Sequence, residues 1–194
     1  MFLFTKPDGL TIDQFLANCR EQTFSYPEVG ATGLTTPAGY NIDNNRILLG
    51  TGEATFDRAK AAIRNWKMFS LGWVELCPAE TPIAADETVA ILVSHFGFYS
   101  LNGARIVYTI DEASRFGFAY GTLVEHGEIG EERFSVEFAA ESGEVWYDLY
   151  AFSRPGSLLA KLGYPLSRYL QKSFAHDSKL AMLHAVADAD AVIE

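Results

Sequence analysis

The chain has 194 residues, of which 48% are hydrophobic, and a formal net charge of −10 at pH 7. This length suits one domain with a substantial core, so we expect residues 1–194 to form a single domain. The acidic balance, without a cluster of Lys and Arg, argues against nucleic-acid binding. No run approaches the roughly 18 apolar residues of a membrane span, and residues 1–9 lack the features of a secretion signal. We therefore expect a cytoplasmic protein without a membrane span.

The two cysteines, Cys19 and Cys77, are isolated in the sequence and form no paired-cysteine motif. This pattern fits neither a disulfide framework nor a zinc site, and it suits a reducing compartment. We expect both to be small core residues. The sequence contains no phosphate-binding loop, nucleophile elbow or helical metal motif, so we predict neither a cofactor nor a metal.

The N-terminal part of the chain predicts a helix, an irregular arm, a strand and a second helix. Thr11 and Gln14 form the pattern of a capping box before the first helix. Residues 26–40 contain five Pro and Gly residues, which favours an irregular arm. Residues 46–52 are typical of a strand, and Thr55 is expected to cap the next helix. The apolar stripe of that helix consists of Phe56, Ala59, Ile63 and Trp66.

From residue 73 to residue 152 the hydrophobic period changes to two, which predicts an antiparallel meander of five or six strands. The dipeptide at 102–103, Asn-Gly, is expected to form a hairpin turn between strands at 88–93 and 104–110. Further strands are predicted at 117–123, 133–138 and 145–152, with a turn at 142–143.

The C-terminal segment returns to helical spacing and predicts one long helix that reaches residue 184. The face expected to meet the sheet carries leucines at four-residue steps: Leu158, Leu162, Leu166 and Leu170. Pro165 lies inside this segment, so we expect a kink or an interruption near Leu162. Residues 185–194 are expected to form a frayed acidic tail.

These elements suggest an α+β fold in which a curved antiparallel sheet grips a long C-terminal helix. This is the helix-grip arrangement of START and Bet v 1-like proteins, and the inference is by analogy. Such a sheet often leaves a cavity beneath the helix, which the many aromatic side chains would line.

Several segments resemble one protein family. They are 24–32 (FSYPEVGAT), 66–69 (WKMF), 105–108 (RIVY), 116–134 and 151–155 (AFSRP). They are similar to the domain-of-unknown-function family numbered nineteen-ninety, found in bacteria and plants, from about the first helix to the last. The resemblance implies no activity, substrate or cofactor, and no residue roles, because none is established for that family.

The densest polar cluster in the sequence lies at residues 126–133, where we expect a loop at the mouth of the sheet. His126 titrates near neutral pH, and Glu132 could orient it or share a metal with it. The pair would then act in acid/base chemistry or form half of a ligand set. The alternative is a solvated hairpin turn in which Glu132 and Arg133 are ordinary strand-end charges.

Five further residues are candidates for ligand contacts. Tyr26 and Glu28 lie in the irregular arm, which is either a lid over the cavity or a strut on the sheet edge. Trp66 could stack on a flat ligand or could belong to the core. Tyr108 and Tyr120 could direct a hydroxyl group into the cavity or could bond to a protein partner.

We consider three functions. The first is binding of a small hydrophobic or amphipathic molecule between the sheet and the C-terminal helix. The second is an enzyme on the same scaffold, with cyclase-like acid/base chemistry by His126, Glu132 and Tyr120. The third is a structural or interaction module without a cavity. The sequence leaves the ligand and the oligomeric state open.

Overall fold

The computed structural model describes residues 1–124, 126–156 and 164–187. Within them, one eight-stranded sheet is accompanied by three α-helices and two short 3₁₀ helices. The elements are β1 (Phe2–Leu3), α1 (Gly9–Arg20), η1 (Ala31–Gly33), β2 (Asn41–Thr51), α2 (Glu53–Arg64), η2 (Lys67–Phe69), β3 (Val74–Cys77), β4 (Thr88–His95), β5 (Phe98–Asp111), β6 (Arg115–Thr122), β7 (Glu128–Ala139), β8 (Glu144–Pro155) and α4 (Tyr164–Ala187).

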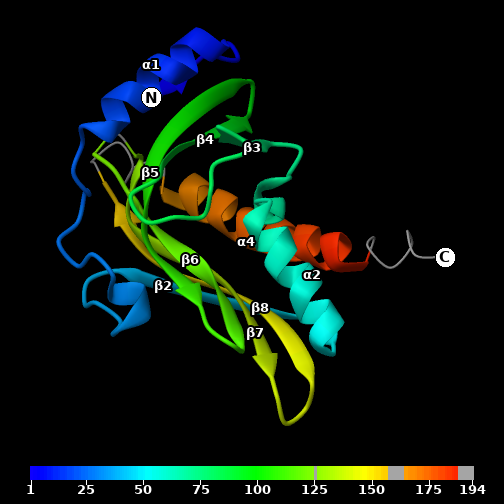
Figure 1. The fold of residues 1–194 in the computed structure, drawn as a ribbon. Helices are drawn as coiled ribbons and strands as arrows, with labels where there is room; N and C mark the ends of the chain where they lie inside the picture. The colour runs from blue at the N-terminus through cyan, green and yellow to red at the C-terminus, as the bar shows by residue number, and fades with distance from the viewer. Residues whose placement is uncertain (125, 157–163, 188–194) are drawn as a thin grey trace.

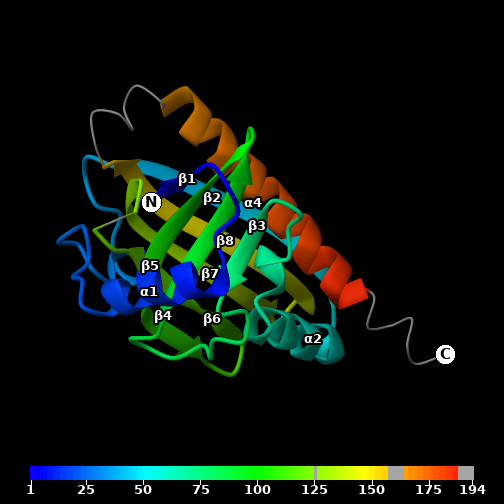
Figure 2. The ribbon, with the colours of Figure 1, turned by 90° about the horizontal axis from the view of Figure 1, so that it is seen from above.

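The sheet is antiparallel and strongly curved, and α4 lies against its concave side (Figure 1). The strand order is β2-β8-β7-β6-β5-β4-β3, and β1 pairs with β5. The helix α2 contacts α4 on the concave side, whereas α1 covers β4 and β5 from the convex side (Figure 2). The predicted helix-grip fold is therefore confirmed. Of the five or six strands expected between residues 73 and 152, the structure has six, β3 to β8.

The main core lies between the concave face and the helices. Its centre is a group of aromatic rings in which Phe118 stacks on Phe134 at 5.3 Å between ring centroids. The predicted apolar stripe is confirmed, because Phe56, Ala59 and Ile63 of α2 are buried, as is Trp66, which lies just beyond the end of the helix. The predicted cap is wrong: Gly52 is the N-cap residue, and the Thr55 hydroxyl donates to the Thr51 carbonyl at 2.8 Å instead.

A second core cluster joins α1 to the convex face. The helix begins earlier than predicted, because Asp8 rather than Thr11 is its N-cap and accepts a hydrogen bond from the Thr11 amide at 2.9 Å. Phe15, Leu16 and Cys19 are buried against the sheet. Cys19 is thus a core residue as expected, whereas Cys77 is only partly buried.

The predicted turn at residues 102–103 is wrong, because both residues lie inside β5. The chain turns instead at Phe96 and Gly97, where both φ angles are positive. Gly103 has a different reason to be glycine. A Cβ atom placed there would lie 2.6 Å from the Cys19 sulfur, so the missing side chain is what allows α1 to approach the sheet.

We expect Gly103→Ala to lower the free energy of unfolding by about 1–3 kcal/mol, because the new methyl group overlaps the Cys19 sulfur. Denaturant unfolding measures this loss. Gly9→Ala is the matched control, since nothing lies within 4 Å of the added Cβ. The double variant with Cys19→Ala should recover part of the loss. Equal stability of Gly103→Ala and the parent would contradict this close contact.

The two halves of α4 differ in what they contact. In the second half, Ser178, Met182 and Val186 are buried against the sheet and α2. In the first half, Leu166 is 39% exposed, so the predicted leucine face is not a buried core face. The four-residue spacing drifts around a helix with 3.6 residues per turn, and this drift explains the error. Leu158 and Leu162 lie outside the described residues.

Pro165 is the second residue of α4 as described, in the first turn. Proline is tolerated there because the first-turn amides have no partner within the helix. The interruption predicted near Leu162 lies outside the described residues. At the other end α4 continues to Ala187 with Val186 buried, and the rest of the expected acidic tail is likewise outside them.

Leu166→Ala should lower the free energy of unfolding by less than about 1 kcal/mol, because a side chain that is already partly in water loses little burial. Met182→Ala, in the same helix but fully buried, should cost about 2–5 kcal/mol. Denaturant unfolding of the two variants compares them directly. Similar losses would show that both halves of α4 are packed alike.

Candidate functional site

The concave face and the first half of α4 border a cavity of about 920 Å³. This volume lies within the range of about 300 to 1,000 Å³ that is typical of small-molecule sites. The cavity exists because only the second half of α4 packs closely on the sheet. Large apolar side chains line much of its wall, among them Phe69, Trp73, Ile91, Phe98, Leu149 and Phe174.

Tyr120 and Glu132 form a hydrogen-bonded pair on this wall. They lie opposite each other on β6 and β7, and the Tyr120 hydroxyl donates to Glu132 Oε2 at 2.7 Å. Both side chains point to the concave side because alternate residues of a strand share a face. Phe118 and Phe134, two positions away on each strand, belong to the same inner core.

Burial controls the pKa of both groups. The loss of surrounding water is the main cause that raises the pKa of Glu132 to about 7; the hydrogen bond from Tyr120 opposes this shift, and the charge of Asp43 adds to it. Burial also raises the pKa of Tyr120 well above its usual value. Near neutral pH the Glu132 carboxyl is therefore present in both forms, and it can donate a proton or accept one.

Asp43 extends this pair into a polar row across the sheet. The register places Asp43 opposite Ala151, and Ala151 opposite Glu132. From α4, Arg168 donates two hydrogen bonds to the Asp43 carboxylate, Nη1 to Oδ2 at 2.5 Å and Nη2 to Oδ1 at 2.8 Å. This two-point contact ties the first half of α4 to β2.

Two more polar contacts hold α4 above the cavity. The Ser167 hydroxyl donates to Glu128 Oε1 at 2.7 Å, and Gln171 Nε2 donates to Ser153 Oγ at 3.2 Å. The second oxygen of Glu128, Oε2, is buried and has no hydrogen-bond partner among the described residues. Burial raises the pKa of this carboxyl group. Glu128 thus presents an unsatisfied acceptor at the cavity wall.

His126 also borders the cavity, but the backbone of its own turn holds its ring. Its Nδ1 lies 3.1 Å from both the amide nitrogen and the carbonyl oxygen of Glu128. Burial lowers the pKa of His126 to about 4, so the ring is neutral at physiological pH. The predicted loop at 126–133 is shorter than expected, because β7 already begins at Glu128. The titratable group in hydrogen-bond contact with Glu132 is Tyr120.

A second cluster of polar side chains lies at the β4–β5 side of the cavity. Asn102 Nδ2 donates to Ser100 Oγ at 3.1 Å, and His95 Nε2 lies 3.2 Å from the same oxygen. His95 Nδ1 is buried without a partner among the described residues, and burial lowers the pKa of this ring. This side of the cavity therefore offers neutral hydrogen-bonding groups.

The irregular arm that contains Tyr26 lies on the convex side, where Glu131 anchors it. Glu131 Oε2 accepts hydrogen bonds from the Tyr26 hydroxyl at 2.6 Å and from the Gly30 amide at 2.7 Å. Its Oε1 accepts from the Thr32 amide at 2.9 Å. The arm thus has the contacts of a strut on the outer face, and Tyr26 is not among the residues of the cavity wall.

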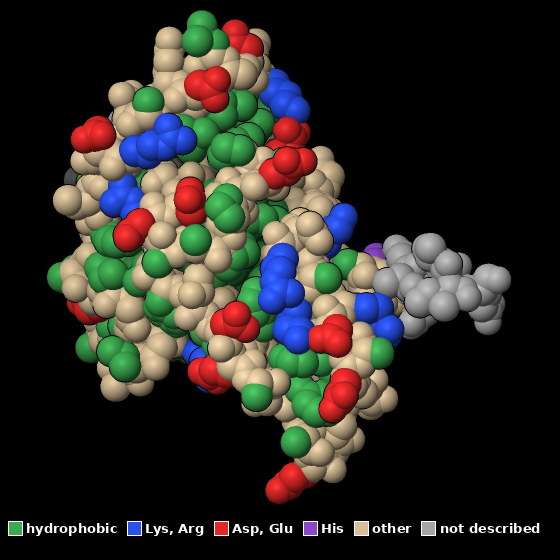
Figure 3. Space-filling view, viewed as in Figure 1, with side chains coloured by type: hydrophobic (Ala, Val, Ile, Leu, Met, Phe, Trp, Pro, Cys, Tyr) green, Lys and Arg blue, Asp and Glu red, His purple; other side chains and the backbone are tan. Residues whose placement is uncertain are grey.

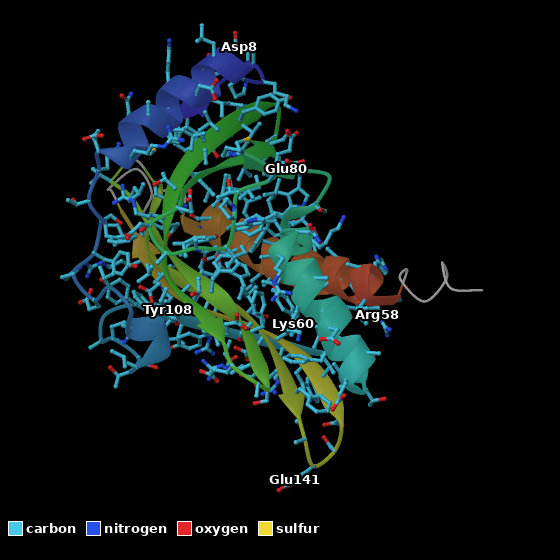
Figure 4. The ribbon with its side chains drawn as sticks, viewed as in Figure 1. Asp8, Arg58, Lys60, Glu80, Tyr108 and Glu141 are labelled. Atoms are coloured by element: carbon cyan, nitrogen blue, oxygen red, sulfur yellow. The ribbon has the colours of Figure 1, made fainter. Side chains whose placement is uncertain are left out.

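Three other sequence candidates also lie outside the wall. The Tyr108 hydroxyl is 2.8 Å from Thr32 Oγ1, beside η1 (Figure 4). Arg133 Nη2 donates to Asp148 Oδ1 at 2.9 Å, and Glu28 accepts a hydrogen bond from the arm itself. Tyr108 and Arg133 attach the arm to the sheet, because Arg133 Nη1 also donates to the Thr32 carbonyl at 2.8 Å. The Glu28 hydrogen bond, in contrast, lies within the arm. Of the eight candidates, Tyr120, His126 and Glu132 are the ones that the structure brings to the cavity.

Trp66 belongs to the core. Its ring centroid is 4.6 Å from that of Phe118, and its Nε1 donates to the Thr81 carbonyl at 2.7 Å. Only 3% of the residue is exposed, and it is absent from the cavity wall. The core interpretation therefore accounts for its surroundings.

Sequence reasoning missed the polar residues that α4 and β2 contribute, among them Asp43 and Arg168. One signal could have found Asp43. Leu49 and Ile47 face the core, and the period of two continues through Asn45 to Asp43, which places a carboxylate on the inner face. No local pattern could have paired it with Arg168, because 125 positions separate the two residues.

No group of three potential metal ligands occurs among the described residues. Within the same part of the chain, no helix combines the length and the apolar character needed to cross a membrane. On the described part of the face in Figure 3, Lys and Arg side chains are interspersed with Asp and Glu side chains.

Comparison with known sequences identifies the family. A sequence model described as "Domain of unknown function (DUF1990)" matches residues 25–181. The chain belongs to this family. The predicted resemblance is therefore confirmed. A UPF0548 protein of Dictyostelium discoideum is 40% identical over 207 residues, which cover 96% of each chain. Another from Deinococcus radiodurans is 41% identical over 179 residues, or 86% of this chain and 89% of that protein.

Among solved structures, this DUF1990 chain is similar to the hypothetical protein jhp0584 of Helicobacter pylori. The TM-score is 0.50 at 14% sequence identity, and the match covers 84% of this chain and 94% of the other. At this identity the similarity shows the fold alone.

Glu132→Gln should change how stability depends on pH. The Glu132 carboxyl has a usual pKa of 4.5 and titrates at about 7 in the folded protein. Between these values the folded state binds more protons than the unfolded state, so the parent loses stability as pH rises. Gln cannot ionise. The variant should therefore gain up to about 3 kcal/mol relative to the parent across this range.

Denaturant unfolding at a series of pH values measures this difference. Glu141→Gln, at the exposed β7–β8 turn, is the control and should follow the parent within about 0.5 kcal/mol. A difference between Glu132→Gln and the parent that stays constant with pH would contradict the raised pKa.

Proposed function

We propose that the protein binds a small amphipathic molecule between the concave face of the sheet and the first half of α4. The observation that carries this proposal is the cavity of about 920 Å³, with a largely apolar wall and a few convergent polar groups. A packed interior would bury the same aromatic side chains without leaving this volume. The cavity thus counts against a module whose function lies only on its surface.

The cellular setting of this binding protein is part of the same proposal. We place it in the cytoplasm as a single domain. Two cysteines in 194 residues suit a reducing compartment. One sheet that runs from β1 to β8 supports a single folding unit.

An enzyme on the same scaffold is the second candidate, and the Tyr120–Glu132 pair favours it. A carboxyl group that exchanges its proton near neutral pH, next to a phenol at 2.7 Å, suits acid/base chemistry on a bound carbonyl compound. Mass spectrometry of a copurified ligand, before and after incubation with the protein, distinguishes the two. A changed mass that depends on Glu132 supports an enzyme, and an unchanged mass supports binding alone.

Ala151→Phe should block ligand binding, because Ala151 lies on the cavity wall between Asp43 and Glu132 and a phenyl ring would fill the space. The probe is Nile red, a neutral apolar dye whose fluorescence rises in an apolar site. We expect the parent to bind it and the affinity of the variant to fall at least about tenfold.

Ala61→Phe is the matched control. It adds the same ring to an exposed position of α2, and it should bind the dye as the parent does. Equal binding by Ala151→Phe and the parent would place the dye elsewhere, and no binding by the folded parent would contradict the proposed function.

A further inference from the structure

We infer that the cavity selects amphipathic molecules that carry a hydrogen-bond donor, an amine or an alcohol on an apolar ring system, over carboxylates and phosphates of similar shape. This inference rests on the proposed function and names the chemical class of its ligand. The basis is a pair of carboxyl groups on the wall, Glu128 and Glu132, each of which has an acceptor oxygen outside the hydrogen bond with its protein partner.

Two carboxyl groups on the wall retain an acceptor oxygen for a ligand. The hydrogen bond that Glu132 accepts from Tyr120 uses Oε2 and leaves Oε1. Glu128 accepts from Ser167 through Oε1, and its buried Oε2 has no partner among the described residues. A buried acceptor without a partner costs about 1–3 kcal/mol, and a ligand that supplies an N–H or O–H group removes this cost.

The cationic side chains near the cavity are either bonded to other residues or exposed to solvent. Arg168 is engaged by both oxygens of Asp43 and also donates to Gln171 Oε1 at 2.7 Å. Among the described residues that line the cavity, the cationic side chain is Lys172, and it is exposed to solvent. An anionic ligand would therefore approach Asp43, Glu128 and Glu132 without a buried cation to balance its charge.

The aromatic residues of the wall and the net charge of the chain favour the same class of ligand. Aromatic rings at Phe69, Trp73 and Phe174 provide flat faces for a ring system, and such faces attract a cation. The Trp73 ring is held in place because its Nε1 donates to Asp177 at 2.9 Å. The net charge of −10 adds a long-range repulsion for anions. A fatty acid or a phospholipid head group fits these features poorly.

Isothermal titration calorimetry with three naphthalenes of the same ring size tests the inference. The probes are 1-naphthylmethylamine, 1-naphthalenemethanol and 1-naphthoic acid, which are cationic, neutral and anionic at about pH 8. We expect the amine and the alcohol to bind the parent, and the acid to bind at least about tenfold more weakly than the amine.

Two variants assign the selectivity to the wall. In Glu132→Gln the amine-to-acid affinity ratio should fall several-fold, and Glu128→Gln provides a second test if the first variant does not fold. Glu137→Gln is the control. It changes the same strand on the opposite face, where Glu137 pairs with Arg46, and it should leave the ratio unchanged.

Each outcome decides between the two proposals. The inference is overturned if the parent binds 1-naphthoic acid as tightly as 1-naphthylmethylamine. It is also overturned if the amine-to-acid affinity ratio is the same in the parent and in both wall variants. Either result leaves the proposed binding in the cavity intact. Nile red binding without binding of any naphthalene also overturns the inference alone. Absence of binding by Nile red and by all three naphthalenes overturns the proposed function together with the inference.

Discussion

The contact between the second half of α4 and the concave face determines where the cavity lies. Met182 and Val186 are buried there, and the Ser178 hydroxyl lies 2.8 Å from that of Tyr147. A straight helix cannot follow a strongly curved sheet along its whole length. Close packing at one end therefore leaves a gap at the other, and this gap is the cavity.

The first half of α4 is held by a different kind of force. Its hydrogen bonds with the sheet come from Ser167, Arg168 and Gln171, and Phe174 adds an aromatic contact with Phe134 of β7. Half-buried ion pairs contribute little net stability, because desolvation offsets much of their attraction. The half of α4 above the cavity is thus less strongly attached than the packed half. Opening of this end would expose the cavity while the main core stays intact.

Two successive carboxylates of β7 show how strand geometry divides structural from ligand-facing roles. Glu131 points outward, and its oxygens are occupied by donors from Tyr26, Gly30 and Thr32 of the arm. Glu132 points inward to the cavity and accepts one hydrogen bond, from Tyr120. The period of two along the strand separates them. One carboxylate fastens the arm to the outside, and the other leaves an acceptor for a ligand.

The sequence by itself determined what depends on local periodicity. The buried stripe of α2, the strands of the meander and the helix-grip class all follow from repeating apolar positions, whose spacing fixes which side chains share a face. Of the site, the sequence placed His126 and Glu132 close to the mouth of the sheet.

Only the tertiary structure decided the features that depend on distant partners. The sequence around Gly103 predicts a turn, yet in the structure this glycine leaves room for the Cys19 side chain of α1, a helix far away in the chain. Leu166 has the four-residue spacing of a core residue, yet it is 39% exposed and borders the cavity. Asp43 meets Arg168 across 125 positions. Local sequence patterns predict which face of a helix or strand a side chain lies on. The residue that it contacts from another element depends on how the whole chain packs.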